Sequence, residues 1–375
     1  MWATSTCRPT NSSTFSTTTP RVSSPCSTIP IECSGTCDQV LSAVARGIPG
    51  LVRLRRSDCG SAGIRRRRVG RGFSYTRDDG RVVTGEEKER IRALAVPPAW
   101  GEVWICPFPT GHIQAVGVDE AGRKQYLYHE QWRVDRDAEK HERVLVLARR
   151  LPGVRERIEA DLSGRGLTRD RVLAGALRIL DRGVFRVGGE EYAEENDSRG
   201  VSTLLRGHVV PRNGQLYFEF PAKSGQQRVA TIKDPLLGKL IVALRKGKKD
   251  DDRLFCHKDG EIRAAEVNER FKEFAGDDFT VKDMRTWTAT VLAATEFAAH
   301  DGPPSKRAVS AVMKAVAEQL GNTPAMARKS YVDPRVVEAF TDGRTIQTAL
   351  KRLAGKGPDE IREPLERAVL RLLRT

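Results

Sequence analysis

The sequence lacks the features that would place it at once among membrane, ATP-driven or metal-dependent proteins. No apolar run reaches the ~18 residues of a membrane span, and no lipidation signal is evident. No GxxxxGK[ST] run for nucleotide binding is present. Cys33 and Cys37 lie close together, but no paired Cys or His ligands accompany them, and the other cysteines match no zinc spacing. We therefore expect reduced cytosolic thiols and no membrane, ATP or metal cofactor.

What the sequence does have is positive charge. Lys and Arg total 64 against 49 for Asp and Glu, which gives a formal net charge of +15. Such an excess favours a polyanionic partner, because binding releases counterions from the partner. The 375 residues are enough for two or three domains with sizeable cores. We expect a globular protein that binds nucleic acid.

The first 50 residues differ in composition from the rest. The first 40 contain 17 Ser or Thr residues and have no uninterrupted apolar stretch of the kind found in secretory signals. We expect a disordered tail, or a start codon assigned too far upstream. The chain then becomes strongly basic at Arg53, Arg55, Arg56, Arg65–Arg68 and Arg71. This segment is either a solvated basic arm or a contact for a phosphate backbone.

An antiparallel sheet is expected next. Short strands near Phe73 and Val82 and a helix over Glu86–Leu94 precede three alternating runs, over Val103–Phe108, His112–Asp119 and Lys124–Trp132. The last run mixes cations and aromatics with period two, so Arg123, Gln125 and one tyrosine are expected to share a face that suits DNA. An ordinary half-buried strand is the alternative.

The remainder reads as mostly helical, with a small sheet inside it. Strands are expected over Val201–Leu205, Gln215–Pro221 and Gln226–Ile232. Helices are expected over Ala138–Leu151, Gly153–Leu162, Thr168–Val187, Pro235–Lys246, Ala264–Phe274, Val281–Ala299, Ser305–Leu320 and Pro334–Phe340. A final segment, Thr345–Thr375, is expected to be helical and exposed. The fold class is therefore α+β, with an N-terminal antiparallel sheet domain and a mostly helical domain that holds a three-stranded sheet.

Four side chains are candidates for chemistry. Tyr331 lies in the basic, turn-rich run Gly321–Pro334, where a phenol is either a nucleophile or a core or surface tyrosine. Arg186 follows Arg178 and Arg182 along one stripe of the expected helix, and the glycines after it let a loop approach a ligand. Lys223 lies at an expected hairpin tip, where local sequence favours a solvated turn lysine over a side chain that takes part in chemistry. Arg285 begins a run without charge up to Glu296, so it must line a site or meet an anion.

These segments together resemble the type IB DNA topoisomerases, in particular the bacterial and poxvirus-like enzymes. The resemblance is carried by FRVGGEEYAEENDSRGVSTLLRGHV (Phe185–Val209), the hairpin Lys223, KDMRTW (Lys282–Trp287) and GNTPAMARKSYVDP, in family order and spacing. Upstream, PPAW, GHIQAVGVD and GRKQYLYHEQW are similar to the N-terminal sheet domain of the bacterial branch. The likeness covers roughly residues 51–355.

The resemblance implies a role for each candidate. Tyr331 would attack a DNA phosphodiester and hold the 3′-phosphate as a phosphotyrosyl ester, while Arg186 and Arg285 would bind the nonbridging oxygens. Lys223 would protonate the departing 5′-oxygen. Asn322 stands where the poxvirus and nuclear enzymes have histidine, and since an amide does not exchange protons near neutral pH, its role would be stabilisation alone.

The resemblance also implies the overall activity and organisation. The protein would relax supercoiled duplex DNA without ATP, metal or another cofactor, as a monomeric clamp in the bacterial cytoplasm at the nucleoid. Residues 51–137 would form the N-terminal clamp domain, residues 138–355 the catalytic domain and residues 356–375 a helical, basic tail. The side chains facing DNA would be Arg123, Lys124, Gln125, Tyr126, Tyr128, Tyr192 and Lys282.

Two other functions remain open from the sequence. A tyrosine recombinase shares the Arg, Lys, Arg, Tyr set, although such enzymes usually carry an HxLR-like run where this chain has Lys282-Asp-Met-Arg285. A non-catalytic basic DNA-binding protein would explain the charge but would not need Tyr331 or Lys223.

Overall fold

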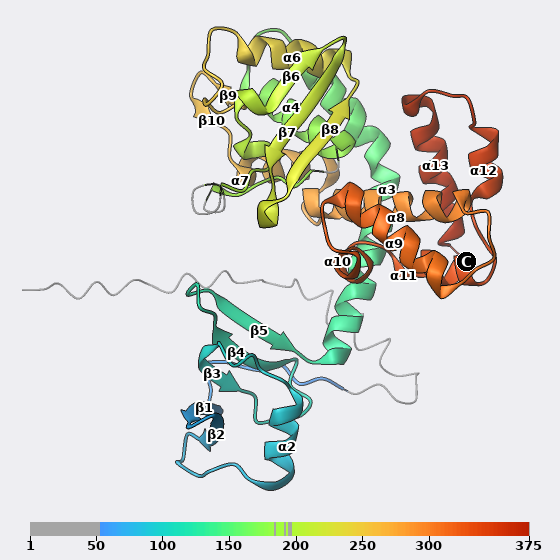
Figure 1. Ribbon diagram of the computed structural model, residues 1–375. Coiled ribbons are helices and arrows are strands. Elements are labelled where there is room, and N and C mark those ends of the chain that lie inside the picture. The colour runs from blue at the N-terminus through green and yellow to red at the C-terminus, as the bar shows by residue number, and fades with distance from the viewer. Residues whose placement is uncertain (1–52, 184, 191–192, 194–196, 375) are drawn as a thin grey trace, which may run out of the picture.

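The computed structural model describes residues 53–183, 185–190, 193 and 197–374. An N-terminal sheet domain and a larger helical part are joined by one long helix, α3 (Glu130–Leu162), which runs from the first into the second (Figure 1). No helix among the described residues has the length and apolar character needed to cross a bilayer. The α+β fold class expected from the sequence is confirmed.

The N-terminal domain is a five-stranded antiparallel sheet in the order β2-β1-β3-β4-β5. Helix α2 (Gly85–Ala93) packs Ile91 against one face of this sheet, where a small core forms around Ile64 and Ile105. The strands are β1 (Ile64–Val69), β2 (Gly72–Arg77), β3 (Gly101–Ile105), β4 (Ile113–Val118) and β5 (Lys124–Tyr128).

The arginine run at 65–68 is an ordered strand and not an irregular arm, although Arg65, Arg67 and Arg68 are exposed to solvent. It forms β1, which pairs along its whole length with β2. Arg66 donates hydrogen bonds to the backbone oxygens of Val96, Pro97 and Trp100, at 3.0, 3.0 and 2.5 Å. An arginine-rich strand is stable here because its neighbours supply acceptors for the inner guanidinium, while Arg65 and Arg68 stay largely in water.

The side chains of β5 are distributed over its two faces differently from the expectation. Lys124, Tyr126 and Tyr128 share the exposed face of the strand, whereas Gln125 points to the other side. The expectation that Arg123 and Gln125 share a face with a tyrosine was therefore wrong, because side chains one residue apart lie on opposite faces of a pleated strand.

Helix α3 is continuous where two helices were expected. It begins at Glu130, so the run to Trp132 is not all strand, and it passes through Pro152 without a break. Leu151, Val154 and Ile158 are each at most 1% exposed, so buried apolar residues on both sides of the proline pack into the same core. This packing outweighs the backbone hydrogen bond that proline cannot donate.

The helical part surrounds a three-stranded antiparallel sheet. Residues Val201–Thr203 form a 3-10 turn instead of the expected strand, and the first strand of the sheet lies further on, at β6 (Val209–Arg212). It pairs with β7 (Gln215–Pro221), which pairs with β8 (Gln227–Ile232). The helices are α4 (Arg169–Gly183), α6 (Pro235–Arg245), α7 (Ala264–Ala275), α8 (Val281–Ala299), α9 (Lys306–Leu320), α10 (Pro324–Ser330) and α11 (Pro334–Thr341).

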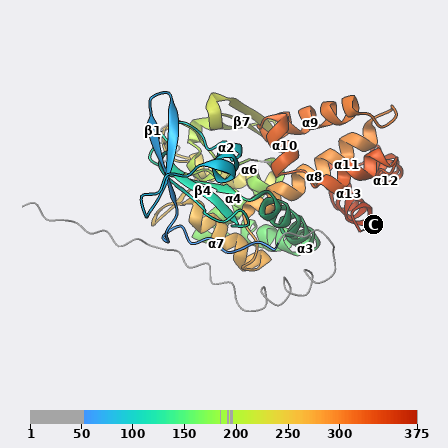
Figure 2. The same cartoon turned by 90° about the horizontal axis from the view of Figure 1, so that it is seen from below.

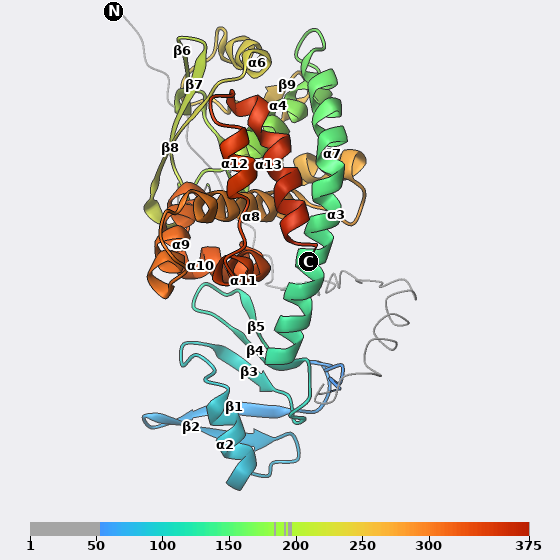
Figure 3. The same ribbon diagram turned by 90° about the vertical axis from the view of Figure 1, so that its right-hand side faces the viewer.

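The C-terminal segment is not an exposed tail, in contrast to the expectation. Helices α12 (Gln347–Arg352) and α13 (Pro358–Leu372) lie on one side of the helical part (Figures 1 and 2). Helix α13 runs beside α3 (Figure 3) and buries Leu365 and Val369 in the main core. Its apolar residues recur at helical spacing, so they form one face that the core covers.

Candidate active site

Four of the five candidate residues come from separate segments that meet at one place. Arg186 follows the end of α4, Arg285 is on α8, Asn322 follows α9 and Tyr331 ends α10. Helix α4 ends at Gly183, so the expectation that it reaches Val187 was wrong, and Arg186 lies on the segment after the helix.

The C-terminal end of α9 supplies the acceptors that hold both arginines. Gly321 ends this helix in the left-handed conformation, with φ 60° and ψ 49°, which glycine adopts without strain. Nη2 of Arg186 donates to Gly321 O at 3.1 Å and also to Oδ1 of Asn322. Nη2 of Arg285 donates to the adjacent Leu320 O. Carbonyls at a helix C-terminus carry partial negative charge, so they attract and orient guanidinium groups.

Tyr331 lies beneath one of these guanidiniums. The Cζ atom of Arg285 is 5.3 Å from the centre of the tyrosine ring. The run before it was expected to be turn-rich but forms the short helix α10, which Thr323 caps by accepting the Met326 N–H at 3.3 Å. Seven residues are too few to produce a periodic apolar stripe, so this helix carried little signal in the sequence.

Helices α8 and α3 hold the backbone around Tyr331 in place. Oγ1 of Thr290 on α8 donates to Tyr331 O at 3.3 Å and accepts from the Asp333 N–H at 3.1 Å. From α3, Nζ of Lys140 donates to Ser330 O at 3.3 Å, and the buried His141 faces Asp333 with 3.8 Å between Nδ1 and Oδ2. The phenol therefore projects from a segment fixed on two sides.

The arginines of the site carry charge that the surroundings disfavour. Burial and the nearby charge of Arg186 lower the pKa of Arg285 to about 10, although the charge of Tyr331 and a side-chain hydrogen bond with it act in the opposite direction. Burial likewise lowers the pKa of Arg186. Arg285 is only 6% exposed, which confirms the expectation that it is buried. A bound anion would relieve this cost, because it would favour the charged form of both groups.

A pocket of about 260 Å³ opens in front of these arginines. Lys223 is exposed in the turn between β7 and β8, as expected, and its neighbours Ala222 and Gln226 both line the pocket. Arg228 also lines it, and sequence reasoning missed this residue, since one arginine in an alternating strand resembles a solvent-facing side chain. The full lining is Phe185, Arg186, Arg199, Phe220, Ala222, Gln226, Gln227, Arg228, Val229, Arg285, Glu318, Leu320 and Gly321.

The residues predicted to face DNA fall into two groups. On β5, Tyr126 and Tyr128 are stacked with 6.1 Å between ring centres, and both are exposed, as is Lys124. In contrast, Arg123 and Gln125 are both engaged with the carboxylate of Asp119, at 2.9 Å each.

On the catalytic side, Lys282 is exposed in the first turn of α8, the helix that carries Arg285. Tyr192 lies outside the described residues. Within the parts of the chain that the structure describes, no three His, Cys, Asp or Glu side chains are grouped so as to hold a metal ion.

Known proteins match both parts of the chain. The family model of the eukaryotic DNA topoisomerase I catalytic core matches residues 129–354, and that of the bacterial DNA topoisomerase IB N-terminal domain matches residues 72–119. A DNA topoisomerase 1B of Acanthamoeba polyphaga mimivirus is 32% identical over 295 residues, which cover 74% of this chain and 87% of the relative. DNA topoisomerase 1 of Rabbit fibroma virus is 24% identical, with 62% and 74% covered.

Among solved structures, the site-specific recombinase XerH bound to its difH substrate is similar at a TM-score of 0.34 and 20% identity, over 51% of this chain and 52% of that one. That likeness is too slight to support an argument about fold or function. The two family models and the mimivirus relative, in contrast, agree over most of the sequence and confirm the expected family. The chain is an enzyme that belongs to the type IB DNA topoisomerases.

Proposed function

We propose that this protein relaxes supercoiled duplex DNA by cutting one strand through Tyr331, allowing the strand to rotate and then resealing it. The observation that carries the proposal is the convergence of Arg186, Arg285 and Asn322 around Tyr331 from four separate segments. A nucleophile beside one buried and one half-buried guanidinium is an arrangement suited to attack on a phosphodiester.

The cleavage step exchanges one phosphate ester for another. The phenol oxygen of Tyr331 gives its proton to water and bonds to phosphorus, while the bond from phosphorus to the 5′-oxygen breaks and Lys223 gives that oxygen a proton. A phenol with a pKa near 10 is a good leaving group, whereas a deoxyribose alkoxide is far more basic, so the acid is needed on the 5′ side. The reverse transfer reseals the strand.

The other residues of the site stabilise the phosphate during this exchange. Arg186 and Arg285 offer planar pairs of donors to the nonbridging oxygens, where negative charge builds up in the transition state. The side-chain nitrogen of Asn322 is buried and has no hydrogen-bond partner among the described residues. Its N–H group can therefore donate a hydrogen bond to a phosphoryl oxygen. An amide does not exchange protons near pH 7, so Asn322 stabilises charge only.

Neither ATP nor metal enters this scheme. The phosphotyrosyl ester preserves the free energy of the broken phosphodiester, so resealing needs no further input, and the two guanidiniums supply the charge that a metal supplies elsewhere. We infer a monomeric clamp at the bacterial nucleoid in the cytoplasm, with residues 51–137 and 138–355 as its two domains.

DNA in this clamp is held from both domains. Lys124, Tyr126 and Tyr128 contact it from β5, and Lys282 and Tyr192 from the catalytic domain. Arg123 and Gln125 contact it after releasing Asp119. Most of these contacts go to phosphates, so binding should weaken steeply with salt and depend little on sequence.

Relaxation of a supercoiled plasmid tests the proposal. The purified protein should relax it with EDTA present and ATP absent, and Tyr331→Phe should abolish relaxation while leaving DNA binding largely intact. Relaxation that persists in this variant would overturn the mechanism. A two-site synapsis assay would detect strand transfer between duplexes instead, which is the outcome expected of a recombinase.

A second experiment tests the acid. Lys223→Ala should slow single-turnover cleavage strongly, and a substrate with a 5′-bridging sulfur should restore the rate, because a thiolate leaves without a proton. Lys258→Ala is the matched control, since Lys258 is an exposed lysine in the turn between two other short strands, β9 (Cys256–His257) and β10 (Gly260–Glu261). If sulfur fails to rescue Lys223→Ala, Lys223 is not the acid.

A further inference from the structure

Arg228 on β8 lines the same pocket as Arg186 and Arg285, and it has no role in the scheme above. We propose that Arg228 is a third guanidinium of the active site and binds a backbone phosphate of the cleaved strand. The inference rests on the proposed function, because it assumes that the cleaved strand of DNA enters this pocket.

The position of Arg228 is set by the elements that position the other two arginines. Its Nη2 donates to the backbone oxygen of Gly183, the last residue of α4, and its Nη1 to that of Glu318 in the last turn of α9, both at 3.3 Å. Its guanidinium also lies 5.4 Å from the ring centre of Phe185. Arg228 therefore reaches the pocket between the helix end that precedes Arg186 and the helix end that holds Arg285.

The contacts of Arg228 leave much of its binding capacity unused. Both hydrogen bonds are longer than the usual 2.7–3.2 Å range for N–H···O bonds, and both acceptors are neutral carbonyls. No carboxylate pairs with Arg228 within the described residues. Arg199 in the same pocket differs, because it is 2.8 Å from the carboxylate of Asp197. A guanidinium has five N–H donors, so Arg228 keeps a pair of them for a ligand.

Apart from Arg199, which pairs with Asp197, three arginines share one small pocket, and their charges imply an anion. Burial and the charge of Arg186 lower the pKa of Arg228, and Arg228 in turn lowers that of Arg285. Each cation therefore disfavours the others while the pocket holds no counter-charge. Glu318 is the one acidic residue among those lining the pocket, and its backbone oxygen is what Arg228 contacts. A DNA strand brings a line of phosphates, so it can neutralise a third guanidinium as well as the first two.

The rival explanation is that Arg228 only ties α4 to α9. The two explanations differ in how they depend on the charge of the DNA. A structural tie acts on every substrate alike, whereas a phosphate contact disappears when the phosphate it touches is made neutral.

The test therefore combines a protein variant with neutral phosphates. Single-turnover cleavage is measured for wild type and Arg228→Ala on four duplexes: one unmodified, and three with a single methylphosphonate, at the scissile phosphate or at the phosphate on either side. On unmodified DNA, Arg228→Ala should be slower by roughly tenfold to a hundredfold, the loss expected for one charge-assisted contact. On one methylphosphonate duplex, the two proteins should cleave at nearly equal rates.

Two further variants distinguish loss of the phosphate contact from loss of folding. Arg228→Lys keeps the positive charge, so it should retain more activity than Arg228→Ala and should show the same dependence on one neutral phosphate. Arg212→Ala removes an exposed arginine from the same three-stranded sheet and should cleave all four duplexes at the wild-type rate. Melting temperatures of all variants report any structural loss separately.

The outcomes separate this inference from the proposed function. If Arg228→Ala and Arg228→Lys slow all four duplexes by one common factor, or do not slow the unmodified duplex at all, the phosphate contact is wrong and the rest of the mechanism stands. If wild type fails to cleave the unmodified duplex, the proposed function itself is wrong.

Discussion

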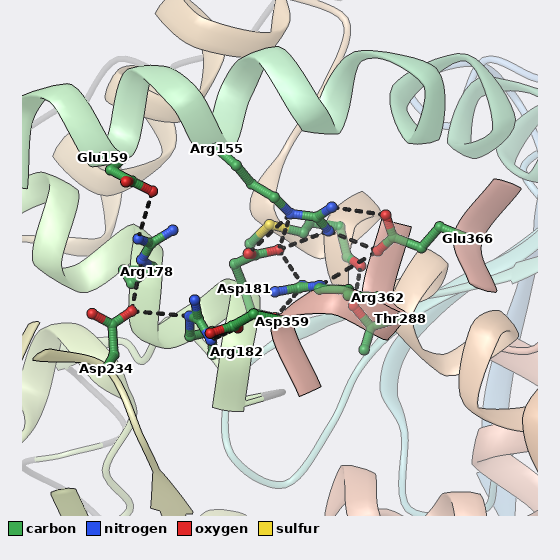
Figure 4. A network of polar contacts seen from close by, with 11 residues as sticks. Arg155, Glu159, Arg178, Asp181, Arg182, Asp234, Thr288, Asp359, Arg362 and Glu366 are labelled. Carbon is green, nitrogen blue, oxygen red and sulfur yellow. Dashed lines mark hydrogen bonds and ion pairs between the residues drawn. The ribbon is translucent and has the colours of Figure 1, made fainter. Parts of the chain in front are cut away.

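Two sets of buried or half-buried arginines lie in the helical part, and they differ in what they contact. The paired network consists of Arg155, Arg178, Arg182 and Arg362, which meet carboxylates (Figure 4). The pocket arginines are Arg186, Arg228 and Arg285, for which backbone carbonyls, an amide and a tyrosine are the contacts described above.

The paired network joins three helices through matched charges. Arg155 on α3 lies 3.2 Å from the carboxylate of Asp181 on α4 and 2.7 Å from that of Glu366 on α13. Arg362 on α13 meets Asp181 as well, at 2.6 Å. Figure 4 shows the guanidiniums of Arg155 and Arg362 converging on the carboxylate of Asp181. Because the chain itself supplies the counter-charges, this network needs no ligand.

Helix α4 shows how one element can contribute to both stability and chemistry. Asp181 and Arg182 lie in the last turn of α4, and Arg186 follows a few residues later. The paired network thus fixes the end of α4 against α13. The chain then leaves the helix with Arg186, which among the described residues donates to a carbonyl and an amide oxygen. Neutralised arginines hold the framework, while the pocket arginines retain charge for an anion.

Breaking the paired network should give the largest effect on stability. Arg155→Met leaves Glu366 without its closest cation and Asp181 with one fewer, and the loss of one member of a buried ion pair costs about 3–5 kcal/mol. Thermal unfolding should show a melting temperature lower by roughly 10 °C. Arg149→Met, an exposed position on the same helix, should change stability by less than about 0.5 kcal/mol. Equal melting temperatures for the two variants would contradict the role given to the network.

Removing a pocket arginine should lower activity strongly without lowering the melting temperature. Arg285→Met should slow DNA cleavage by roughly 10²–10³-fold, the usual cost of one donor to a transition-state oxygen. Its melting temperature should stay equal to that of wild type or rise, because the lowered pKa of about 10 means that the charged arginine is disfavoured in the free folded protein. A fall in melting temperature as large as that of Arg155→Met would show that the two sets of arginines do not differ.

The sequence predicts the members of the site better than their surroundings. Arg285 was expected to be buried because an uncharged run follows it, and it is only 6% exposed. Lys223 was expected at a hairpin tip, and it lies in the turn between β7 and β8. Arg178, Arg182 and Arg186 seemed to form one stripe, yet the first two join the paired network and the third joins the pocket. Helical spacing assigns residues to a stripe only as far as the helix runs, and α4 ends at Gly183.

Other features depend on partners that are distant in the chain. The burial of α13 follows from contacts with α3 and α8, more than 50 residues away, and local charge made it look exposed. Arg228 enters the site because its side chain bridges the ends of α4 and α9. Such contacts are made by the tertiary fold, so local periodicity carries no information about them.

The smallest expected effect is a difference between the two sets of arginines in how folding stability depends on pH. Burial alone would raise the pKa of Asp181, but Arg362 and Arg155 outweigh it and hold that pKa below its usual value. The folded state thus favours the ionised carboxylate, so the stability it contributes is present above about pH 4 and is lost as pH falls through the folded-state pKa. Asp181→Asn should therefore weaken the loss of folding free energy as pH falls below about 4, by an amount on the order of 1–2 kcal/mol, measured by thermal unfolding at a series of pH values. Arg285→Met should keep the wild-type dependence over the same range, because the pocket arginines do not titrate there. If both variants kept it, Asp181 would not be the carboxylate that links acid pH to the paired network.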